Sequence, residues 1–212
     1  MTGSPGQAIR SDRAIIMARG LGVRMGSPKG LLRLSANGPA FVRIIADLYF
    51  QRGMPVDVLA LAEVIRDLER ELPESQGCRV LSEASGGDTA LTMLMSWRSC
   101  KMAGIPCSHF WAHPVDLPLV APGTLDLLAE YSAVHPTRIL RPVRAGIPGH
   151  PVILPYDVLT ELDRRVSFHK GPLREFLSRG VTMDWFSPPM EVEVEDTGID
   201  RDFDRPGDFE PN

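Results

Sequence analysis

A glycine-rich stretch near the start of the chain holds the residues best suited to chemistry. Its glycines and cations are Gly20, Gly22, Arg24, Gly26 and Lys29, and an apolar run at 14–18 precedes them. Glycine lets backbone N–H groups approach a polyphosphate without interference from a Cβ, and the two cations offset phosphate charge. An apolar strand that leads into such a loop is typical of a nucleotide site, so we expect a substrate with several phosphates.

Two better-known glycine motifs do not fit this stretch. A P-loop places Lys-Ser or Lys-Thr directly after its second glycine, whereas Ser27 and Pro28 separate Gly26 from Lys29. The dinucleotide fingerprint has the spacing G-x-G-x-x-G, and the glycines here read G-x-G-x-x-x-G, which is longer. The stretch therefore predicts a phosphate-binding loop of a different kind.

Carboxylates form the second group of candidates. Asp116 follows an apolar strand predicted at 109–113 and stands between two prolines, which fix the direction of the chain. Near the end of the sequence, Asp202 and Asp204 belong to a crowded acidic segment. Crowded carboxylates repel one another unless they are solvated or share a cation. A turn at the strand end and a solvated acidic tail are the structural alternatives to a cation site.

Two histidines on the predicted strand do not indicate a zinc site. His109 and His113 are four positions apart, which on a strand separates them by about 13 Å, too far for one zinc ion. We expect His113 to be a core or turn histidine, although a place in a substrate cleft is the alternative.

Four motifs, in order along the chain, resemble those of the MobA/MocA-like nucleotidyltransferases, which attach CMP or GMP to the molybdenum cofactor. The later three read D-L-P-L-V at 116–120, G-H-P-V at 149–152 and D-F-D-R-P-G-D-F at 202–209. The first is the glycine-rich stretch, where the matching positions are Met17, Ala18, Gly20, Gly22, Arg24, Met25, Gly26 and Lys29. The resemblance covers nearly the whole chain.

The resemblance implies a role for each matched residue. Arg24, Lys29 and Asp116 are the expected catalytic residues. Mg²⁺ is the implied cofactor, held by Asp116 together with an aspartate of the last motif, where Asp202 is slightly favoured over Asp204. Contacts to the nucleotide or the acceptor are expected from Ala18, Arg19, Gly20, Gly22, Gly26, Gly87, His150 and Arg174. For the last three, a structural or solvated role is the alternative.

The reaction implied by the resemblance needs no nucleophile from the protein. A terminal phosphate of molybdopterin, or of its molybdenum-loaded form, attacks the α-phosphorus of a nucleoside triphosphate and releases pyrophosphate. Residues 27–32 favour CTP over GTP. Arg19, however, stands where the family usually has alanine or glycine. A molybdoenzyme or its chaperone is a conceivable protein partner.

Two alternative functions stay open at this point. One is a nucleotidyltransferase that acts on a sugar phosphate or another phosphorylated small molecule. The other is a catalytically inactive nucleotide-binding regulator, for which Arg19 and a loose motif match around Gly87 are the support.

Composition limits the remaining function classes. The chain has 212 residues, 43% of them hydrophobic, and a net charge of -4 without a sustained Lys/Arg block, which argues against nucleic acid or an anionic membrane as the main partner. An apolar run of transmembrane length and a signal-peptide core are both missing, so we expect a cytoplasmic protein. Cys78, Cys100 and Cys107 are expected to be buried, reduced thiols.

Alternating strand and helix patterns predict an α/β fold with three layers, a mostly parallel sheet with helices on both faces. The resemblance implies the Rossmann-like fold of the nucleotide-diphospho-sugar transferases. We expect residues 1–11 to be a flexible tail and 12–212 to form a single nucleotidyltransferase domain. Helices are expected at 39–52, 62–72, 89–102, 122–133 and 156–165, with another starting at 170; strands at 14–18, 55–61, 78–81, 109–113, 138–143 and 190–194; and a loop at 144–149.

Overall fold

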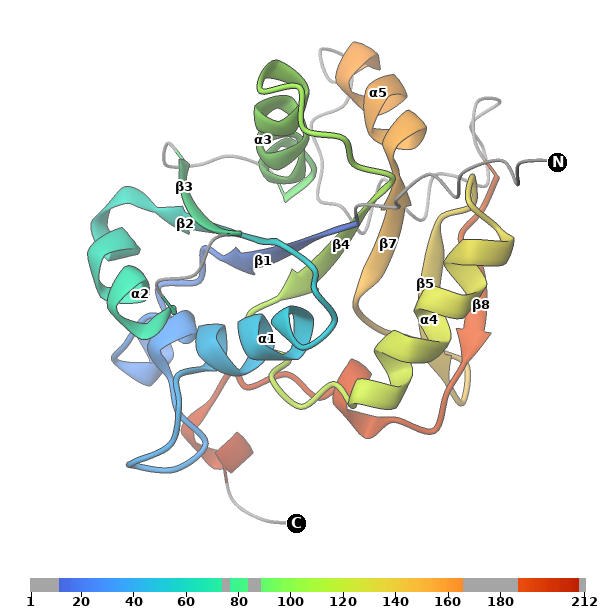
Figure 1. Cartoon of the computed structure of the whole chain (residues 1–212). Helices are drawn as coiled ribbons and strands as arrows, with labels where there is room; N and C mark the ends of the chain where they lie inside the picture. Colours follow the sequence, from blue (N-terminus) through green and yellow to red (C-terminus); the bar gives the residue numbers. More distant parts are fainter. Residues whose placement is uncertain (1–11, 74–76, 84–88, 166–186, 210–212) are drawn as a thin grey trace, which may run out of the picture.

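The structure is a computed structural model that describes residues 12–73, 77–83, 89–165 and 187–209 (Figure 1). Its helices are α1 (Phe41–Phe50), α2 (Ile65–Glu71), α3 (Thr89–Met102), α4 (Pro122–Val134) and α5 (Tyr156–Arg165). Its strands are β1 (Arg13–Ala18), β2 (Val56–Leu61), β3 (Cys78–Glu83), β4 (His109–Pro114), β5 (Leu140–Arg144), β6 (Ile147–Pro148), β7 (Val152–Pro155) and β8 (Met190–Glu193). Short 3₁₀ helices are η1 (Val23–Met25), η2 (Lys29–Leu31), η3 (Ala62–Val64), η5 (Thr197–Ile199) and η6 (Pro206–Phe209).

All these strands belong to one mixed sheet. Their order is β3-β2-β1-β4-β7-β5-β6, and β8 pairs with β5 outside this path. The pairs among β3, β2, β1 and β4 are parallel, whereas β7 runs antiparallel to both β4 and β5. The carboxyl ends of β1 and β4 therefore lie side by side, and the start of β7 reaches the same edge.

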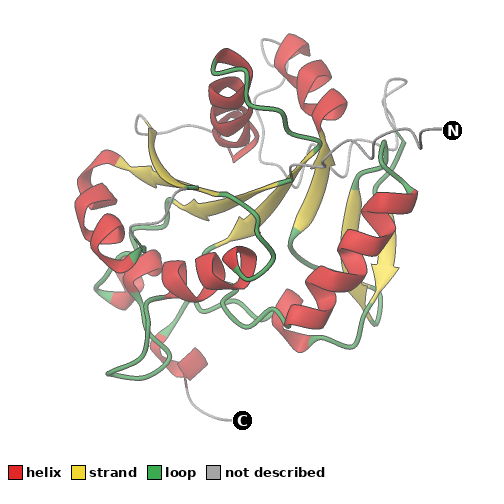
Figure 2. Ribbon diagram, in the orientation of Figure 1, coloured by secondary structure: helices red, strands yellow, loops and turns green. Residues whose placement is uncertain are grey.

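Helices cover both faces of the sheet (Figure 2). They pack on it around two separate cores. One core lies between the sheet and α1, α2 and α4, and the other lies between the sheet and α3 and α5. Side chains alternate along β1, so that Ile16 belongs to the first core and Ile15 to the second. The strand is buried on both faces, which explains why its sequence reads as a continuous apolar run.

A buried ionic cluster ties three strands to α3. The Asp57 carboxylate on β2 is fully buried and accepts hydrogen bonds from Arg13 of β1 at 2.8 Å and from Arg79 of β3 at 2.6 and 2.8 Å. The Ser96 hydroxyl of α3 donates to the same carboxylate at 2.5 Å. These charge-assisted bonds compensate for the cost of burying the carboxylate.

The predicted elements agree with the observed ones up to β5, but two strands after it, β6 and β7 (Val152–Pro155), are not among the predicted strands. Residues 144–149 are not a plain loop, because β6 pairs with the end of β5 as a hairpin. Ala145 and Gly146 form its two-residue turn, with φ of 50° and 78°. Two-residue hairpin turns require such positive values. Asn, Asp or Gly usually occupies both positions, and because Ala145 stands at the first, the sequence does not indicate the turn. The expected tail at 1–11 and the helix expected from 170 lie outside the described residues.

The three cysteines are free thiols. Cys100 is buried as expected, whereas Cys78 and Cys107 are only partly buried. Burial raises the pKa of the Cys78 thiol to about 11, and the pKa of the Cys107 thiol to about 12. Both thiols are therefore protonated and unreactive at neutral pH.

None of the described helices combines the length and apolar character needed to cross a membrane.

Candidate functional site

The glycine loop and Asp116 meet at the carboxyl edge of the sheet. The loop starts where β1 ends at Ala18, and Asp116 lies two residues beyond the end of β4. The two chain segments stay paired past the strands, because the Val115 N–H donates to the Met17 carbonyl at 3.2 Å. Ligands of open α/β sheets bind at this edge, so the topology supports the sequence-based location of the site.

The glycines shape the loop in the way the sequence suggests. Gly22 and Gly26 have φ of 57° and 68°, a left-handed conformation that L side chains rarely adopt. A Cβ at Gly22 would stand 1.9 Å from the Ser27 carbonyl oxygen. The loop closes through a hydrogen bond of 2.9 Å from the Lys29 N–H to the Gly20 carbonyl. The loop thus contains the 3₁₀ helix η1 and continues at Lys29 into the 3₁₀ helix η2, and the next α-helix, α1, starts only at Phe41.

Lys29 crosses over Gly20 to reach two carboxylates. A Cβ at Gly20 would lie 3.0 Å from the aliphatic chain of Lys29, so the glycine makes room for this side chain. Its ammonium donates to Asp116 Oδ2 at 2.7 Å and also to Asp204. Burial alone lowers the pKa of Lys29, but its hydrogen bonds and charge interactions with both aspartates outweigh that effect, and the pKa is raised. Lys29 is therefore a cation held between two carboxylates at the centre of the site.

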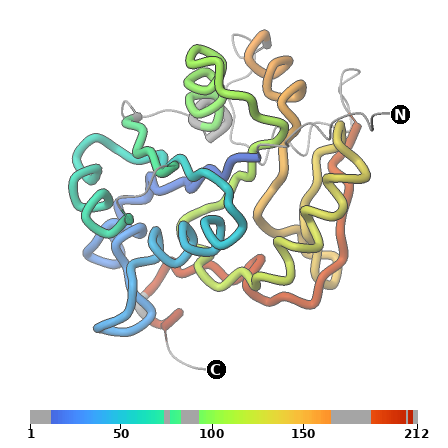
Figure 3. Tube along the Cα trace, viewed as in Figure 1, coloured from blue at the N-terminus to red at the C-terminus, as the bar shows by residue number. Residues whose placement is uncertain are grey.

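Aromatic packing brings the C-terminal segment back to this site. Phe203 packs on Phe41 of α1 at a ring distance of 5.3 Å and on Phe209 at 5.1 Å. The Phe203 N–H also donates to the Asp116 carbonyl at 3.1 Å. Figures 1 and 3 show this red segment passing beneath α1 toward the blue loop. The residues on either side of Phe203 are consequently held next to Asp116.

Of the two terminal aspartates, Asp204 is the one that contacts Lys29. Asp202 is exposed, and no hydrogen bond joins it to Lys29. Partial burial and the negative charges of Asp204 and Asp116 nevertheless raise the pKa of Asp202, with Lys29 opposing them. The three carboxylates therefore form one electrostatic group. The slight preference for Asp202 over Asp204 has no geometric support in the structure.

The other residues expected to bind nucleotide occupy varied positions. Ala18 is buried at the end of β1, Arg19 is half-buried directly after it, and Arg24 is exposed on η1. Arg24 thus lies on the loop without the central position of Lys29. Gly87 and Arg174 lie outside the described residues.

The two histidines near the site have different surroundings. His113 is fully buried: it contacts the Tyr49 hydroxyl at 3.0 Å through Nδ1 and the Leu117 carbonyl at 2.9 Å through Nε2. Burial lowers the pKa of His113 to about 4, so it is a neutral core histidine, as expected. His150 precedes β7, and its Nδ1 is buried and makes no hydrogen bond. Burial lowers the pKa of His150, although a hydrogen bond to the Ala112 carbonyl and the charge of Asp116 oppose that effect.

The site has the donors for phosphate binding and the carboxylates for a cation. Within the described part of the chain, no cluster of three or more His, Cys, Asp or Glu residues has metal-binding geometry. Instead, the Lys29 ammonium occupies the position between Asp116 and Asp204. Hard oxygen ligands of this kind suit Mg²⁺ or Mn²⁺. The donor set therefore fits a divalent cation, provided that the ammonium moves toward a phosphate.

Two aspartates that sequence reasoning did not assign hold the C-terminal segment in place. The Asp208 carboxylate accepts the N–H groups of Asp204 and Arg205 at 2.8 and 2.6 Å. Asp196 accepts the N–H of Ala121 at 2.7 Å, just before α4, and the Gly198 N–H at 2.8 Å. Both residues belong to the acidic segment, but their spacing alone did not separate these structural carboxylates from site carboxylates.

Solved structures with this fold include nucleotidyltransferases. A nucleotidyl transferase from Methanothermobacter thermautotroptrophicus (Mth528) is 17% identical, with 94% of each chain covered and a TM-score of 0.71. Molybdopterin-guanine dinucleotide biosynthesis protein A from Archaeoglobus fulgidus is 14% identical over 93% of this chain and 94% of that chain, with a TM-score of 0.67. Rv0371c from Mycobacterium tuberculosis H37Rv, in complex with manganese, is 17% identical over 87% of this chain and 89% of that chain, with a TM-score of 0.61.

These likenesses confirm the nucleotide-diphospho-sugar transferase fold, with mostly parallel central strands. A comparison with curated protein sequences gives no match. The sequence profile of the MobA-like NTP transferase domain, however, matches residues 14–183, a range that includes both the glycine loop and Asp116. The chain therefore belongs to the family of MobA-like NTP transferase domains.

Proposed function

We propose that this nucleotidyltransferase moves a nucleoside monophosphate, from CTP in preference to GTP, to the phosphate of molybdopterin or the molybdenum cofactor. The observation that carries the proposal is the convergence of Lys29, Asp116 and Asp204 beside the glycine loop. An oxygen of the acceptor phosphate forms a bond to the α-phosphorus of the nucleotide. The bond from that phosphorus to its bridging oxygen breaks, and its electron pair leaves with pyrophosphate.

The chain's own residues contribute binding and charge. The loop between Gly20 and Lys29 offers backbone N–H groups to the triphosphate, and we assign Arg24, exposed on η1 within that loop, to its outer oxygens. Lys29 supplies a positive charge that approaches the phosphates when it leaves its carboxylate partners. Catalysis of this kind consists of positioning and electrostatic stabilisation, because the acceptor brings the nucleophile.

A divalent metal ion is part of the proposal. Asp116 and Asp204 would hold it, with Asp202 close enough to add its charge. When bound, the ion supplies Lewis-acid screening of phosphate oxygens. The manganese complex of Rv0371c, a protein of the same fold, supports a divalent metal, and we propose Mg²⁺ as the resident ion.

Arg19 is the residue that we propose for recognition of the base. Arg19 is half-buried at the end of β1, next to the loop, so its guanidinium is a candidate for reading a base oxygen. Residues 27–32 favour CTP. A sugar phosphate is the alternative acceptor, since a cytidylyltransferase and a 4-diphosphocytidyl-2C-methyl-D-erythritol synthase share the fold.

Pyrophosphate release tests the proposal. The purified protein is incubated with each of the four NTPs and Mg²⁺, alone, with molybdopterin, or with a panel of sugar phosphates. We expect release that requires molybdopterin and is fastest with CTP. A requirement for a sugar phosphate instead would establish the alternative acceptor, and nucleotide binding without turnover would establish a non-catalytic binding protein.

Matched variants link that activity to the site. Asp116→Asn is expected to lower kcat/KM by about 10²-fold or more, because it removes charge aimed at the reacting groups. Asp67→Asn is the control, since among the described residues Asp67 makes an ion pair only with Arg70, exposed on α2. Equal activity of the two variants would contradict the assignment of Asp116.

A further inference from the structure

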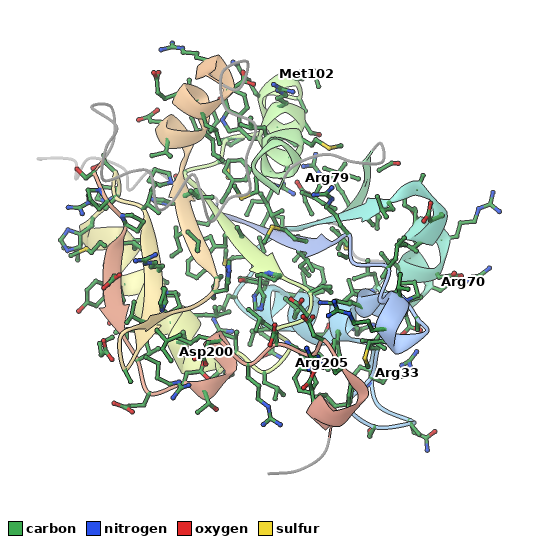
Figure 4. The ribbon with its side chains drawn as sticks, turned by 180° about the vertical axis from the view of Figure 1, so that it is seen from behind. Arg33, Arg70, Arg79, Met102, Asp200 and Arg205 are labelled. Atoms are coloured by element: carbon green, nitrogen blue, oxygen red, sulfur yellow. The ribbon has the colours of Figure 1, made fainter. Side chains whose placement is uncertain are left out.

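A cleft of about 470 Å³ lies along the C-terminal segment, and its lining residue Asp208 binds the N–H of Asp204, the partner of Lys29. The glycine loop follows β1, whereas the cleft lies at the end of β5 and along the C-terminal segment, and β4 and β7 separate these two strands in the sheet. In Figure 4, Asp200 and Arg205 lie along the C-terminal segment, with Arg33 beyond Arg205. The charged residues that line the cleft are Arg144, Asp200, Arg201, Asp202 and Asp208.

Most of these charges already have partners. Arg144 Nη2 donates to both oxygens of Asp200, at 2.9 and 3.2 Å. Asp208 uses its carboxylate to accept the two backbone N–H groups described above. The ion pair with Asp200 neutralises Arg144, and the backbone N–H groups offset the charge of Asp208. These hydrogen bonds hold the wall of the cleft formed by Arg144, Asp200 and Asp208 in place.

Arg201 differs from Arg144 in its contacts. Its guanidinium lies over the Phe203 ring, 5.6 Å from the centroid, and Nη2 contacts the Asp208 backbone carbonyl at 3.5 Å. In the part of the chain that the structure describes, no carboxylate forms an ion pair with it. The ring contact holds the guanidinium beside the C-terminal segment, and its other N–H groups can donate to a phosphate.

We infer that the cleft binds the acceptor as a phosphomonoester and that Arg201 contacts its phosphate, an inference that rests on the proposed function. Asp202 directly follows Arg201, lines the same cleft, and interacts electrostatically with Asp204 and Asp116. A phosphate on Arg201 therefore lies beside the carboxylates proposed for the metal, where the nucleophile must be. The volume is within the range of about 300–1,000 Å³ typical of small-molecule sites.

The cleft also limits the chemistry of the rest of the acceptor. Asp200 and the Asp208 carbonyl present oxygens that accept hydrogen bonds, and Arg144 holds the first of these in a fixed direction. They select a phosphomonoester that carries hydroxyl or amino donors. Both a pterin phosphate and a sugar phosphate meet this description, so the experiment has one arm for each.

Calorimetric titration distinguishes these sources and tests Arg201. Molybdopterin, under anaerobic conditions, and glucose 1-phosphate are titrated separately into wild type, Arg201→Gln, Arg201→Lys and Arg70→Gln, all with Mg²⁺. Arg70 is the control because it is exposed on α2, far from Asp200 (Figure 4). A parallel titration measures the Kd of CTP, and circular dichroism with thermal melting verifies that each variant is folded.

The inference predicts a selective loss of acceptor affinity. For the phosphate that binds wild type, Arg201→Gln is expected to raise Kd about tenfold or more, Arg201→Lys is expected to raise it less, and Arg70→Gln is expected to leave it unchanged. The Kd of CTP stays within about twofold, because Arg201 belongs to the C-terminal segment and not to the glycine loop proposed to bind the nucleotide.

Several results would overturn the inference: wild-type affinity in Arg201→Gln, an equal loss of CTP affinity, or no binding of either phosphate to wild type. If wild type releases no pyrophosphate but binds a phosphate through Arg201, the proposed function fails while the phosphomonoester site stands. If transfer occurs and Arg201→Gln changes no acceptor constant, the site fails while the function stands.

Discussion

Replacing Lys29 with methionine tests whether an ammonium and a metal ion compete for the same carboxylates. Methionine keeps the length and most of the apolar contact of the lysine chain but removes its charge. The contact to Asp116 at 2.7 Å represents about 6 kcal/mol of attraction at an effective dielectric constant of about 20. The side chains of Lys29 and Asp116 are only 19% and 22% exposed, so desolvation offsets much of this attraction.

The net cost of the replacement is correspondingly smaller. The Asp204 side chain is 39% exposed, so solvent screens its contact with Lys29 strongly. We expect Lys29→Met to destabilise the protein by about 1–3 kcal/mol, mostly because Asp116 and Asp204 are left as neighbouring like charges. For a chain of this size that loss corresponds to a decrease in Tm of about 2–12 °C.

Magnesium should reverse this loss in the variant. With the ammonium removed, the carboxylates can take the ion without displacing a partner. At an Mg²⁺ concentration about 100 times its Kd, binding stabilises the folded state by about 2.7 kcal/mol, which is about 5–10 °C in Tm. In wild type the ion must first displace Lys29, so the increase in Tm at equal Mg²⁺ is smaller.

The assay is thermal unfolding with increasing MgCl₂ at ionic strength held constant with NaCl, so that general screening is the same in every sample. Lys101→Met is the control, because Lys101 lies over the Trp97 ring on α3, on the opposite face of the sheet. It should respond to Mg²⁺ like wild type. Equal increases in Tm for wild type and Lys29→Met, or an undiminished increase in the double variant Lys29→Met/Asp116→Asn, would refute the reasoning.

Three further predictions follow from the loop, the core and the acidic group. Gly22→Ala should abolish CTP binding in a calorimetric titration, since its Cβ would lie 1.9 Å from a carbonyl oxygen. Gly53→Ala is the control: Gly53 has a φ of 66° and open space around it, so this variant should lose stability but bind CTP normally. His113→Gln should lose less stability than wild type on acidification. The pKa of His113 is lowered from 6.5 to about 4, so the unfolded state binds the extra proton and the stability of wild type falls as pH drops below about 6.5. Urea unfolding should therefore show a loss of free energy of unfolding from pH 7 to pH 5 that is about 2 kcal/mol smaller in the variant. Without metal, Asp202→Asn should be more stable than wild type at pH 7 but not at pH 3. The raised pKa of Asp202 means that the folded state binds the proton of this carboxyl more tightly than the unfolded state, so wild type loses stability as pH rises. A variant less stable than wild type at pH 7 would contradict this prediction.

The elements and the glycine loop could be predicted from local sequence because their causes are local. The buried run of β1, the helical periodicity of α1 and the left-handed glycines at 22 and 26 each depend on a few neighbouring residues. The hairpin after β5 escaped prediction, since Ala145 occupies a turn position that usually signals itself through Asn, Asp or Gly.

The carboxylate chemistry could be predicted only as a set of candidates. The sequence supplied Asp116 and an acidic C-terminal segment, but in a run such as 200–208 every aspartate has the same local appearance. Their actual roles differ widely: Asp200 pairs with Arg144, Asp204 contacts Lys29, and Asp208 binds backbone N–H groups. These differences come from distant partners, about which spacing within the segment carries no information.

The sequence by itself determined that a strand leads into a phosphate-type glycine loop with a lysine, and that carboxylates exist elsewhere to accompany it. Only the tertiary structure decided which of them meet, since Lys29 lies 87 positions from Asp116 and 175 positions from Asp204. Parallel pairing of β1 with β4 makes the first contact, and packing of Phe203 and Phe209 on α1 makes the second. Both depend on burying apolar surface between elements that are remote in sequence, and that burial places the charges at one edge of the sheet.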